Sequence, residues 1–286
     1  MPDIEAFEAQ RSRLTGLAYR MLGSVAEAED VVQDAWLRWT RTEEEVRDPA
    51  GWLVRTTSRL CIDRLRSAKA QREAYRGPWL PEPLIGELTV DPVERAEDVS
   101  VAFLLALERL SPLERAVFLL HDVFDEDYDA IAETLGRSEP AVRQLAARAR
   151  AHVKDSRPRF TVSQEHAAKL AAAFMAAAAK GDMQALSAVL AEDAVLLSDG
   201  GGKRKAALRP LVGREDVVRL LQGVAWRAGA DHVWPLNFRA VRINGYPGVI
   251  LEHEDGPMTI AFQPGEDGRL AAIYLVRNPD KLGHLA

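Results

Sequence analysis

Apolar residues recur at helical spacing through the first part of the chain. The pattern predicts one helix over residues 4–22, and Ser24 with Glu27 has the spacing of a capping box that starts a second helix. The Asp48-Pro49 pair predicts a third helix over residues 50–72, because proline is tolerated at the first helical position. We therefore expect an all-α domain over residues 1–75.

The next segment is rich in residues that interrupt helices. Between residues 76 and 93 the chain has four prolines and two glycines, which favour an extended conformation and predict a linker over residues 76–95. Helical spacing resumes at about Val93 and continues to about Val153, with interruptions near Ser111 and at Gly136. We expect a second all-α domain over residues 96–158.

The pattern changes again after about residue 163. Two helical segments are followed by short apolar or alternating runs, which turn signals such as Asn244-Gly245 and Asp255-Gly256 separate. This order predicts an α+β domain over residues 159–286, in which helices precede an antiparallel meander. The expected helices are His166–Ala179 and Met183–Leu190, and the expected strands are Ala194–Leu197, His232–Ile243, Gly248–His253, Met258–Gln263 and Leu270–Arg277.

Residues 128–147, YDAIAETLGRSEPAVRQLAA, have the pattern of a helix-turn-helix. Ala132 is small at the position where the second helix crosses the first. Gly136 supplies the turn, since glycine adopts a left-handed backbone without a steric penalty. The second helix of such a unit enters the DNA major groove, so the motif indicates DNA binding rather than an ordinary helical hairpin.

The net charge of −6 is unusual for a DNA-binding protein, but the basic residues are concentrated. The segments Trp52–Arg76 and Arg137–Arg159 each contain seven Lys or Arg against two acidic residues. Two basic segments suit a protein that contacts phosphate backbones at two places, although solvated helix faces would have the same composition.

The remaining composition excludes several classes of protein. Cys61 is the single cysteine, so no internal disulfide can form, and its position in the apolar phase of a helix predicts a buried, inert thiol. No apolar run reaches the length of a membrane span, and the N-terminus lacks the features of a signal peptide. We expect a cytoplasmic protein that contacts no membrane and holds no metal or cofactor.

Residues 1–155 resemble the small extracytoplasmic-function class of the sigma-70 family. The resemblance is carried by AEAEDVVQDAWLRWTR (26–41), DPAGWLVRTTSRLCIDRLRSAKAQRE (48–73) and the helix-turn-helix. It implies an RNA polymerase sigma factor that directs promoter-specific transcription initiation. The first string would bind the clamp helices of the polymerase β′ subunit, and the second would recognise and melt the −10 element. The helix-turn-helix domain would bind the −35 element and the β flap.

The resemblance, together with the charge of the two basic segments, assigns residues to three contacts. Arg59 stands where many relatives have asparagine. We interpret Trp52 as a packing residue and Asp63 as an intrahelical ion-pair partner. The expected contacts with polymerase are Glu29, Asp30, Gln33 and Asp34; those with the −10 element are Arg55, Arg59, Arg64 and Arg66; those with the −35 element are Arg143, Gln144, Arg148 and Arg150.

The remaining residues resemble the SnoaL-like cone fold that is fused to one group of these factors. Three short signatures of that group occur in order: WLPEPL (79–84), DGGGK (199–203) and NPDKL (278–282). The resemblance implies that this domain modulates sigma activity through intramolecular contacts with the linker and the sigma domains. The linker would then be an extended ligand anchored by Trp79 and Leu80, with a plain spacer as the alternative. The expected regulatory interface comprises Trp79, Leu80, Pro81, Glu82, Pro83, Asp199, Gly200, Gly201, Gly202, Lys203, Asn278, Pro279, Asp280, Lys281 and Leu282.

Two other classes of function are compatible with the same elements. A dimeric helix-turn-helix repressor with a ligand domain would bind duplex DNA without polymerase. An enzyme with a helical accessory region would turn over a small molecule, but the acidic and histidine residues of the last domain form no recognisable catalytic pairing. We therefore expect no enzymatic activity, while a small-molecule ligand for this domain is left open.

Overall fold

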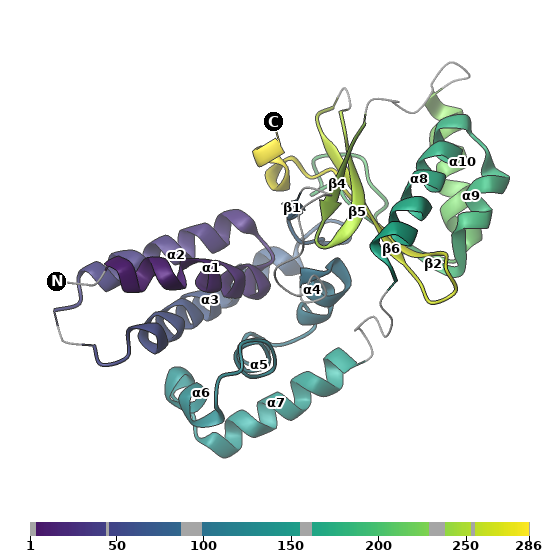
Figure 1. Cartoon of the computed structure of the whole chain (residues 1–286). Coiled ribbons are helices and arrows are strands. Elements are labelled where there is room, and N and C mark those ends of the chain that lie inside the picture. The colour runs from purple at the N-terminus through teal and green to yellow at the C-terminus, as the bar shows by residue number, and fades with distance from the viewer. Residues whose placement is uncertain are drawn as a thin grey trace. The chain divides into compact units, whose positions relative to one another are not determined.

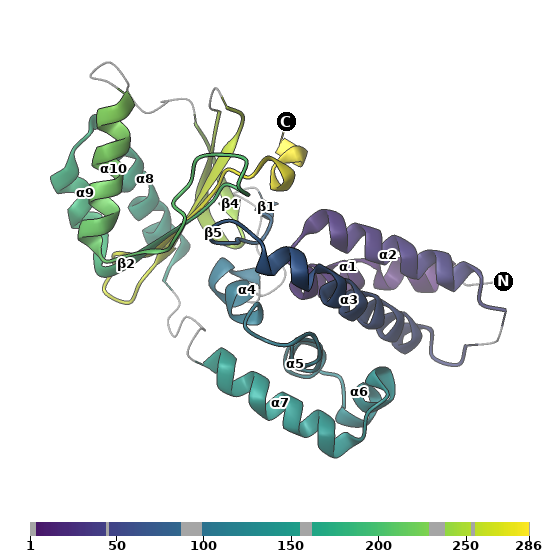
Figure 2. The same ribbon diagram turned by 180° about the vertical axis from the view of Figure 1, so that it is seen from behind.

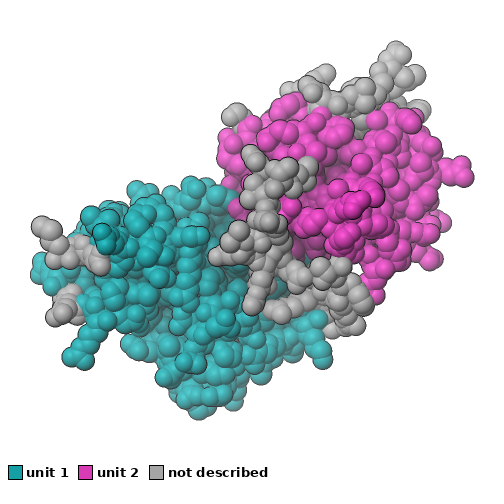
Figure 3. Space-filling model, in the orientation of Figure 1, with its two compact units in different colours: residues 1–74, 102–157 teal, residues 75–101, 158–286 magenta. Residues whose placement is uncertain are grey.

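The computed structural model describes residues 4–43, 46–86, 99–154, 162–228, 238–252 and 255–285. The chain forms two compact units (Figures 1 and 3). Unit 1 contains residues 1–74 and 102–157, and unit 2 contains residues 75–101 and 158–286. The proline-rich segment therefore belongs to the same compact unit as the C-terminal domain. Within the described ranges, no helix is long and apolar enough to cross a membrane.

Three helices form the N-terminal half of unit 1: α1 (Ile4–Leu22), α2 (Val25–Thr40) and α3 (Pro49–Glu73). The predicted N-cap of α2 is confirmed, because the Ser24 hydroxyl accepts a hydrogen bond from the Glu27 amide at 3.2 Å. The side chains of Trp39 and Trp52 pack with ring centroids 5.3 Å apart, which supports a packing role for Trp52.

The second half of unit 1 consists of α4 (Val101–Leu107), α5 (Pro112–Phe118), a π-helix η2 (Leu119–Val123), α6 (Tyr128–Leu135) and α7 (Glu139–Val153). The helix-turn-helix prediction is confirmed in α6 and α7. Gly136 ends α6 in the left-handed conformation at φ 61° and ψ 43°, and Val142 of α7 is fully buried. Two predicted features lie outside the described residues: the helix start at Val93 and the end of the second basic segment.

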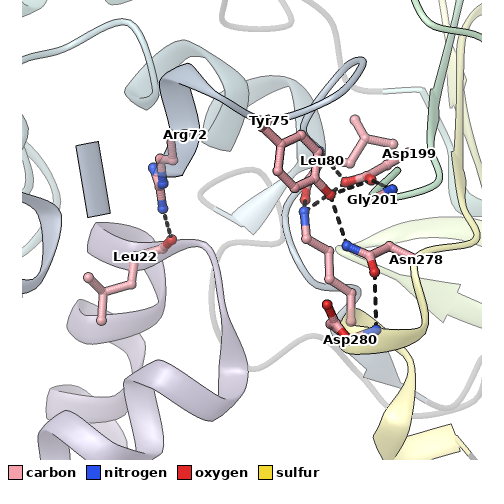
Figure 4. A network of polar contacts seen from close by, with 9 residues as sticks. Leu22, Arg72, Tyr75, Leu80, Asp199, Gly201, Asn278 and Asp280 are labelled. Carbon is pink, nitrogen blue, oxygen red and sulfur yellow. Dashed lines mark hydrogen bonds and ion pairs between the residues drawn. The ribbon is translucent and has the colours of Figure 1, made fainter. Parts of the chain in front are cut away.

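Buried charge connects the two helical halves of unit 1. The Arg115 side chain is almost completely buried and donates to the Met21 carbonyl at 2.6 Å and to Glu108 at 2.7 Å. Arg72 of α3 also pairs with Glu108 and donates to the Leu22 carbonyl at 2.7 Å (Figure 4). Burial lowers the pKa of Arg115, and the neighbouring Glu108 carboxylate opposes that shift. The Arg115 Nη1 donors are satisfied by the Met21 carbonyl and by Glu108, and the ion pair offsets part of the cost of burying the charge, although Nε has no partner among the described residues.

Unit 2 has three helices, α8 (Gln164–Lys180), α9 (Met183–Val189) and α10 (Arg214–Ala228), on one face of a sheet (Figures 1 and 2). The core between these layers includes Phe174 and Phe262, whose ring centroids are 5.2 Å apart. The sheet has the order β1-β4-β5-β6-β7-β2-β3. Its strands are β1 (Ile85–Gly86), β2 (Leu190–Asp199), β3 (Leu211–Val212), β4 (Phe238–Ile243), β5 (Tyr246–Leu251), β6 (Met258–Pro264) and β7 (Leu270–Val276).

The predicted α+β domain is confirmed, with two differences in topology. Strands β4 to β7 form the expected antiparallel meander, but β2 pairs with β7 in parallel. The parallel pairing is possible because a long connection that includes α10 separates the two strands in the chain. The sequence interpretation also omitted α10, and the start of the expected strand at His232 lies outside the described residues.

Candidate functional site

The parallel pairing of β2 with β7 brings two of the sequence signatures together. Asp199 is the last residue of β2 and is in register with Val276, two residues before Asn278. The Asp199 carbonyl accepts hydrogen bonds from the amides of Arg277, at 2.7 Å, and Asn278, at 3.1 Å. The backbone of DGGGK is therefore joined directly to the start of NPDKL.

The Asp199 carboxylate is completely buried and accepts four hydrogen bonds. Oδ1 accepts from the Tyr75 hydroxyl at 2.6 Å and the Gly201 amide at 2.9 Å. Oδ2 accepts from the Leu80 amide at 2.9 Å and the Lys281 ammonium at 2.7 Å. Two of the four donors come from the segment that precedes β1, so one carboxylate connects that segment with the DGGGK turn and with Lys281 near the C-terminus (Figure 4).

Lys281 neutralises this buried carboxylate and contacts the linker itself. Its ammonium lies 4.2 Å from the centroid of the Trp79 ring and 5.1 Å from that of Tyr75, and it also donates to the Leu80 carbonyl. A cation that is enclosed by aromatic faces, a carboxylate and a carbonyl retains its charge away from bulk water. The Lys281 side chain is 12% exposed, which places the ion pair inside the domain.

The Tyr75 hydroxyl is the second junction between the linker and NPDKL. It donates to Asp199 and accepts from the Asn278 side-chain amide at 2.8 Å. Burial, followed by the hydrogen bond to Asp199, raises the pKa of Tyr75 above its ordinary value. The hydroxyl therefore stays protonated and remains a donor at neutral pH.

Glycine is required at two positions of DGGGK because other atoms approach closely. A Cβ at Gly200 would lie 2.2 Å from the Arg204 carbonyl oxygen, and a Cβ at Gly201 would lie 2.4 Å from the Asn278 side chain. Gly201 also has a φ of 61°. The Gly-rich turn thus leaves room for Asn278 to reach Tyr75.

The linker continues along the face of the sheet opposite the helices. Leu80 is completely buried and, with Pro81 and Pro83, lines a small cavity against Ala261 and Tyr274. This contact is possible because side chains alternate along a strand, so the sheet has a second apolar face.

Asn244 fixes the end of this linker segment. The Asn244 side-chain oxygen accepts from the Leu84 backbone amide at 3.2 Å. The Asn244 backbone amide donates to the Leu84 carbonyl at 2.9 Å, and the side-chain Nδ2 donates to the Val99 carbonyl at 2.9 Å. Beyond Leu84, Ile85 and Gly86 pair with β4 as the edge strand β1.

The other predicted interface residues lie at the periphery of this cluster. Glu82 is buried and lies 3.5 Å from the His284 ring. Lys203 pairs with Asp280 at 2.6 Å, but both side chains are more than half exposed. Pro279 is exposed, Leu282 is buried, and a Cβ at Gly202 would contact the Arg76 side chain.

Two residues of the cluster, Tyr75 and Asn244, were not predicted from the sequence. Tyr75 precedes the WLPEPL signature by four positions, and nothing in the local pattern distinguishes it from other tyrosines. Asn244 was interpreted only as a turn residue, which its φ of 49° agrees with, but the same residue binds the linker. No sequence signal marks this role, because an Asn-Gly turn has the same residues whether or not the asparagine side chain is buried.

The residues predicted to bind the −35 element lie exposed on α7. Arg143 pairs with Glu139 one turn earlier. Arg148 lies 3.3 Å from Glu114, and Arg150 lies 2.7 Å from Asp122. Three of the four residues therefore contact an acidic side chain within the same domain.

Glu114 is held in its charged form beside Arg148. Burial alone would raise its pKa, but hydrogen bonds from Ser111 and the charge of Arg148 outweigh that effect and lower it. Of the three pairs, only Arg143–Glu139 joins two exposed side chains, and such a pair contributes about 0–1 kcal/mol.

The residues predicted to bind the −10 element all lie on α3, with Arg55 near Asp48 at 4.0 Å. Arg66 pairs with Asp63 at 3.6 Å, which confirms the intrahelical role predicted for Asp63. Arg59 differs from the others because its partners belong to α6. Its guanidinium donates to the Thr134 carbonyl at 2.8 Å and to the Glu133 carbonyl at 3.3 Å.

The four residues predicted to bind polymerase occupy two adjoining faces of α2. Glu29 and Gln33 line a groove of about 540 Å³ between α1 and α2, together with Phe7, Arg11, Thr15, Val32 and Trp36. Asp30 and Asp34 instead face Arg64 of α3, at 3.5 Å and 3.7 Å. The structure thus brings Glu29 and Gln33 together and separates them from the two aspartates.

Cys61 is completely buried in α3, as predicted. Burial is the main cause of a raised thiol pKa, which the nearby Arg64 partly offsets. The thiol therefore remains protonated and unreactive at neutral pH.

Two family models match the chain. The model described as Sigma-70 region 2 matches residues 6–71, and the model described as Sigma-70, region 4 matches residues 100–153. These ranges correspond to the helices α1 to α3 and α4 to α7.

The chain is also similar to known proteins over nearly its whole length. It is 39% identical to the ECF RNA polymerase sigma factor SigJ of Mycobacterium tuberculosis, covering 98% of this chain and 93% of that protein. The crystal structure of M. tuberculosis SigJ has a TM-score of 0.78 at 36% identity and 98% coverage of both chains. A SnoaL-like protein of unknown function from Burkholderia thailandensis has a TM-score of 0.30 at 15% identity, covering 40% of this chain and 97% of that one.

Proposed function

Because the chain belongs to the extracytoplasmic-function sigma factors of the sigma-70 family, we propose that its C-terminal domain modulates transcription by holding the linker between the two sigma domains. Sigma factors bind core RNA polymerase and promoter DNA and catalyse no reaction of their own. The observation that carries the proposal is the buried Asp199 carboxylate, which accepts hydrogen bonds from Tyr75 and Leu80 of the linker and from Lys281 of the C-terminal segment.

The physical basis of the modulation is the reach of the linker. The segment that connects the two helical halves of unit 1, Tyr75–Val101, has 27 residues and would span about 90 Å if fully extended. The −10 and −35 elements are about 25 base pairs apart, which corresponds to about 85 Å along a DNA strand. When residues 75–86 and Val99 are held by the C-terminal domain, the remaining residues 87–98 can span only about 40 Å. Docking therefore restricts the separation that the linker allows between the two sigma domains.

The same proposal assigns the contacts with polymerase and promoter. Glu29 and Gln33 would receive the β′ clamp helices, since they line the groove between α1 and α2, and the helix-turn-helix domain would contact the β flap. The exposed face of α7 would bind the −35 element, and the arginines of α3 would bind the −10 element.

Run-off transcription with core polymerase tests the regulatory proposal. Lys281→Met removes the buried cation that joins Asp199 to the linker, whereas Lys203→Met makes the same substitution in an exposed ion pair of the same two signatures. We expect Lys281→Met to change transcript yield and Lys203→Met to leave it near that of the unaltered chain. Equal yields from both variants and the unaltered chain would remove the regulatory role and leave the sigma assignment intact.

A further inference from the structure

Tyr128, the first residue of α6, contacts the recognition helix as well as its own helix. The Arg143 guanidinium carbon lies 4.4 Å from the centroid of the Tyr128 ring. On the side of the preceding π-helix, the His121 ring lies 4.0 Å from Tyr128, and His121 Nδ1 lies 2.9 Å from the Glu126 carbonyl. The tyrosine ring is thus supported by η2 and in turn supports an arginine of α7.

The remaining contacts of Arg143 leave one edge of its guanidinium open. Glu139 Oε1 accepts from Nε at 3.0 Å and from Nη2 at 2.5 Å. A guanidinium has five N–H donors, so both protons of Nη1 and one of Nη2 stay available. Those end-on donors form the pair that binds O6 and N7 of guanine in the major groove. Glu139 and Tyr128 therefore hold Arg143 without occupying the donors that a base requires.

Tyr128 also lies next to a second arginine of α7. Arg150 Nε donates to Asp122 of the π-helix at 2.7 Å. The hydrogen bond to Asp122 is the main cause of a raised pKa for Arg150. Burial opposes this rise, and the Tyr128 hydroxyl contributes to it. The π-helix places Asp122 beside Arg150 and His121 beside Tyr128, and wide helical turns of this kind often occur at functional sites.

We propose that Tyr128 is a positioning residue for promoter recognition: its ring orients Arg143 toward a base edge. The inference rests on the proposed binding of α7 to the −35 element. A free arginine must be immobilised when it binds DNA, and prior ordering of one long side chain is worth about two- to tenfold in affinity. That gain applies only to the base that Arg143 contacts, so it increases sequence preference rather than general affinity for DNA.

A promoter library tests this proposal with the full chain bound to core polymerase. The upstream DNA is randomised, the transcripts are sequenced, and base preference is measured position by position for the unaltered chain and for Arg143→Ala, Tyr128→Leu and Tyr128→Phe. Arg143→Ala identifies the position that Arg143 reads. We expect Tyr128→Leu to reduce the guanine preference at that same position by about two- to tenfold and to preserve the preferences at other positions. Tyr128→Phe, which retains the ring, should keep the preference.

Each other outcome is decisive. If Tyr128→Leu leaves the Arg143 position unchanged, or weakens every position equally, Tyr128 has only a structural role in the helix-turn-helix and the proposal is wrong. If Arg143→Ala alters no position, the proposed base contact of Arg143 itself fails, and the positioning role falls with it.

Discussion

Asp199 accepts four hydrogen bonds in a site from which water is excluded, and this explains why an aspartate is needed there. A carboxylate has two oxygens and no protons, so each oxygen can accept from two donors. An asparagine at the same position would present one oxygen and one NH₂ group. Either orientation of that amide would place NH₂ against two donors, one of them the Lys281 ammonium or the Tyr75 hydroxyl.

Asp199→Asn should therefore release the linker, whereas Asp280→Asn should not. Removing one partner of a buried ion pair costs about 3 kcal/mol, but an exposed pair such as Lys203–Asp280 contributes less than about 1 kcal/mol. Hydrogen–deuterium exchange of peptides from residues 75–86 measures the difference. We expect exchange to accelerate about 100-fold in Asp199→Asn and less than about tenfold in Asp280→Asn. Equal protection in the two variants would show that Asp199 does not hold the linker.

The sequence predicts which residues belong to the site better than it predicts which residues they contact. The signatures DGGGK and NPDKL identify Asp199 and Lys281, because a motif records which residue types a site requires. The contact of Asp199 with Tyr75 joins residues 124 positions apart, and it depends on the parallel register of β2 and β7. That register follows from the whole sheet and not from local residue preferences.

Two glycines with the same backbone conformation differ in what surrounds them. Gly136 ends α6 and Gly201 lies in the DGGGK turn, both at a φ of 61°. A Cβ at Gly136 would have no heavy atom within 4 Å, whereas a Cβ at Gly201 would overlap the Asn278 side chain. The comparison separates the conformational cost of an L-residue from the cost of displacing a neighbour.

We expect Gly136→Ala to reduce the unfolding free energy of its unit by about 1 kcal/mol, from the left-handed backbone alone. Gly201→Ala should cost more and should also expose the linker, because Asn278 must move away from Tyr75. Urea titration gives the unfolding free energies, and hydrogen–deuterium exchange of residues 75–86 measures how well the linker is protected. If the linker stays equally protected in both variants, the Gly201 turn does not support the Asn278 contact.

Among the elements, those with strong periodicity or caps were predictable and those defined by tertiary pairing were not. The helix-turn-helix was found because Gly136 and the apolar positions around it form a fixed pattern. Helix α10 has buried residues at helical spacing, Val217 and Leu221, but two such positions are too few to predict a helix. The edge strands β1 and β3 have two residues each, too short for any alternation to be visible.

Across unit 1, Arg59 joins the helices α1 to α3 to the helix-turn-helix domain. Its guanidinium donates to carbonyls at the C-terminal end of α6, where the helix dipole favours a positive charge. The same side chain cannot contact DNA while these bonds are made. If the two halves of unit 1 bind promoter elements about 85 Å apart, as we propose, this contact must break on binding.

Arg59→Ala should lower the unfolding free energy of unit 1 more than Arg66→Ala does. Both substitutions remove an arginine from α3, but the partner of Arg66 is Asp63 on the same helix. A cation at a helix C-terminus contributes about 1–2 kcal/mol when partly buried, and an exposed intrahelical pair contributes less than about 0.5 kcal/mol. Denaturant unfolding of the two variants provides the comparison. A loss for Arg59→Ala no greater than that for Arg66→Ala would contradict the proposed role of Arg59 in unit 1.

The relation between the linker and the C-terminal domain is the central claim at the scale of the whole molecule. Docking of residues 75–86 and Val99 shortens the free connection between the two sigma domains from about 90 Å to about 40 Å. A docked linker should therefore limit the distances between promoter elements that the factor accepts. A released linker should tolerate a wider range of distances.

Run-off transcription from promoters that differ only in the number of base pairs between the −10 and −35 elements tests this claim most directly. With core polymerase, the unaltered chain and Lys203→Met should use a narrow range of spacings. Lys281→Met, which removes the buried cation from the docking site, should use a broader range that includes longer spacings. An identical spacing profile for Lys281→Met and the unaltered chain would contradict control of promoter use through the docked linker.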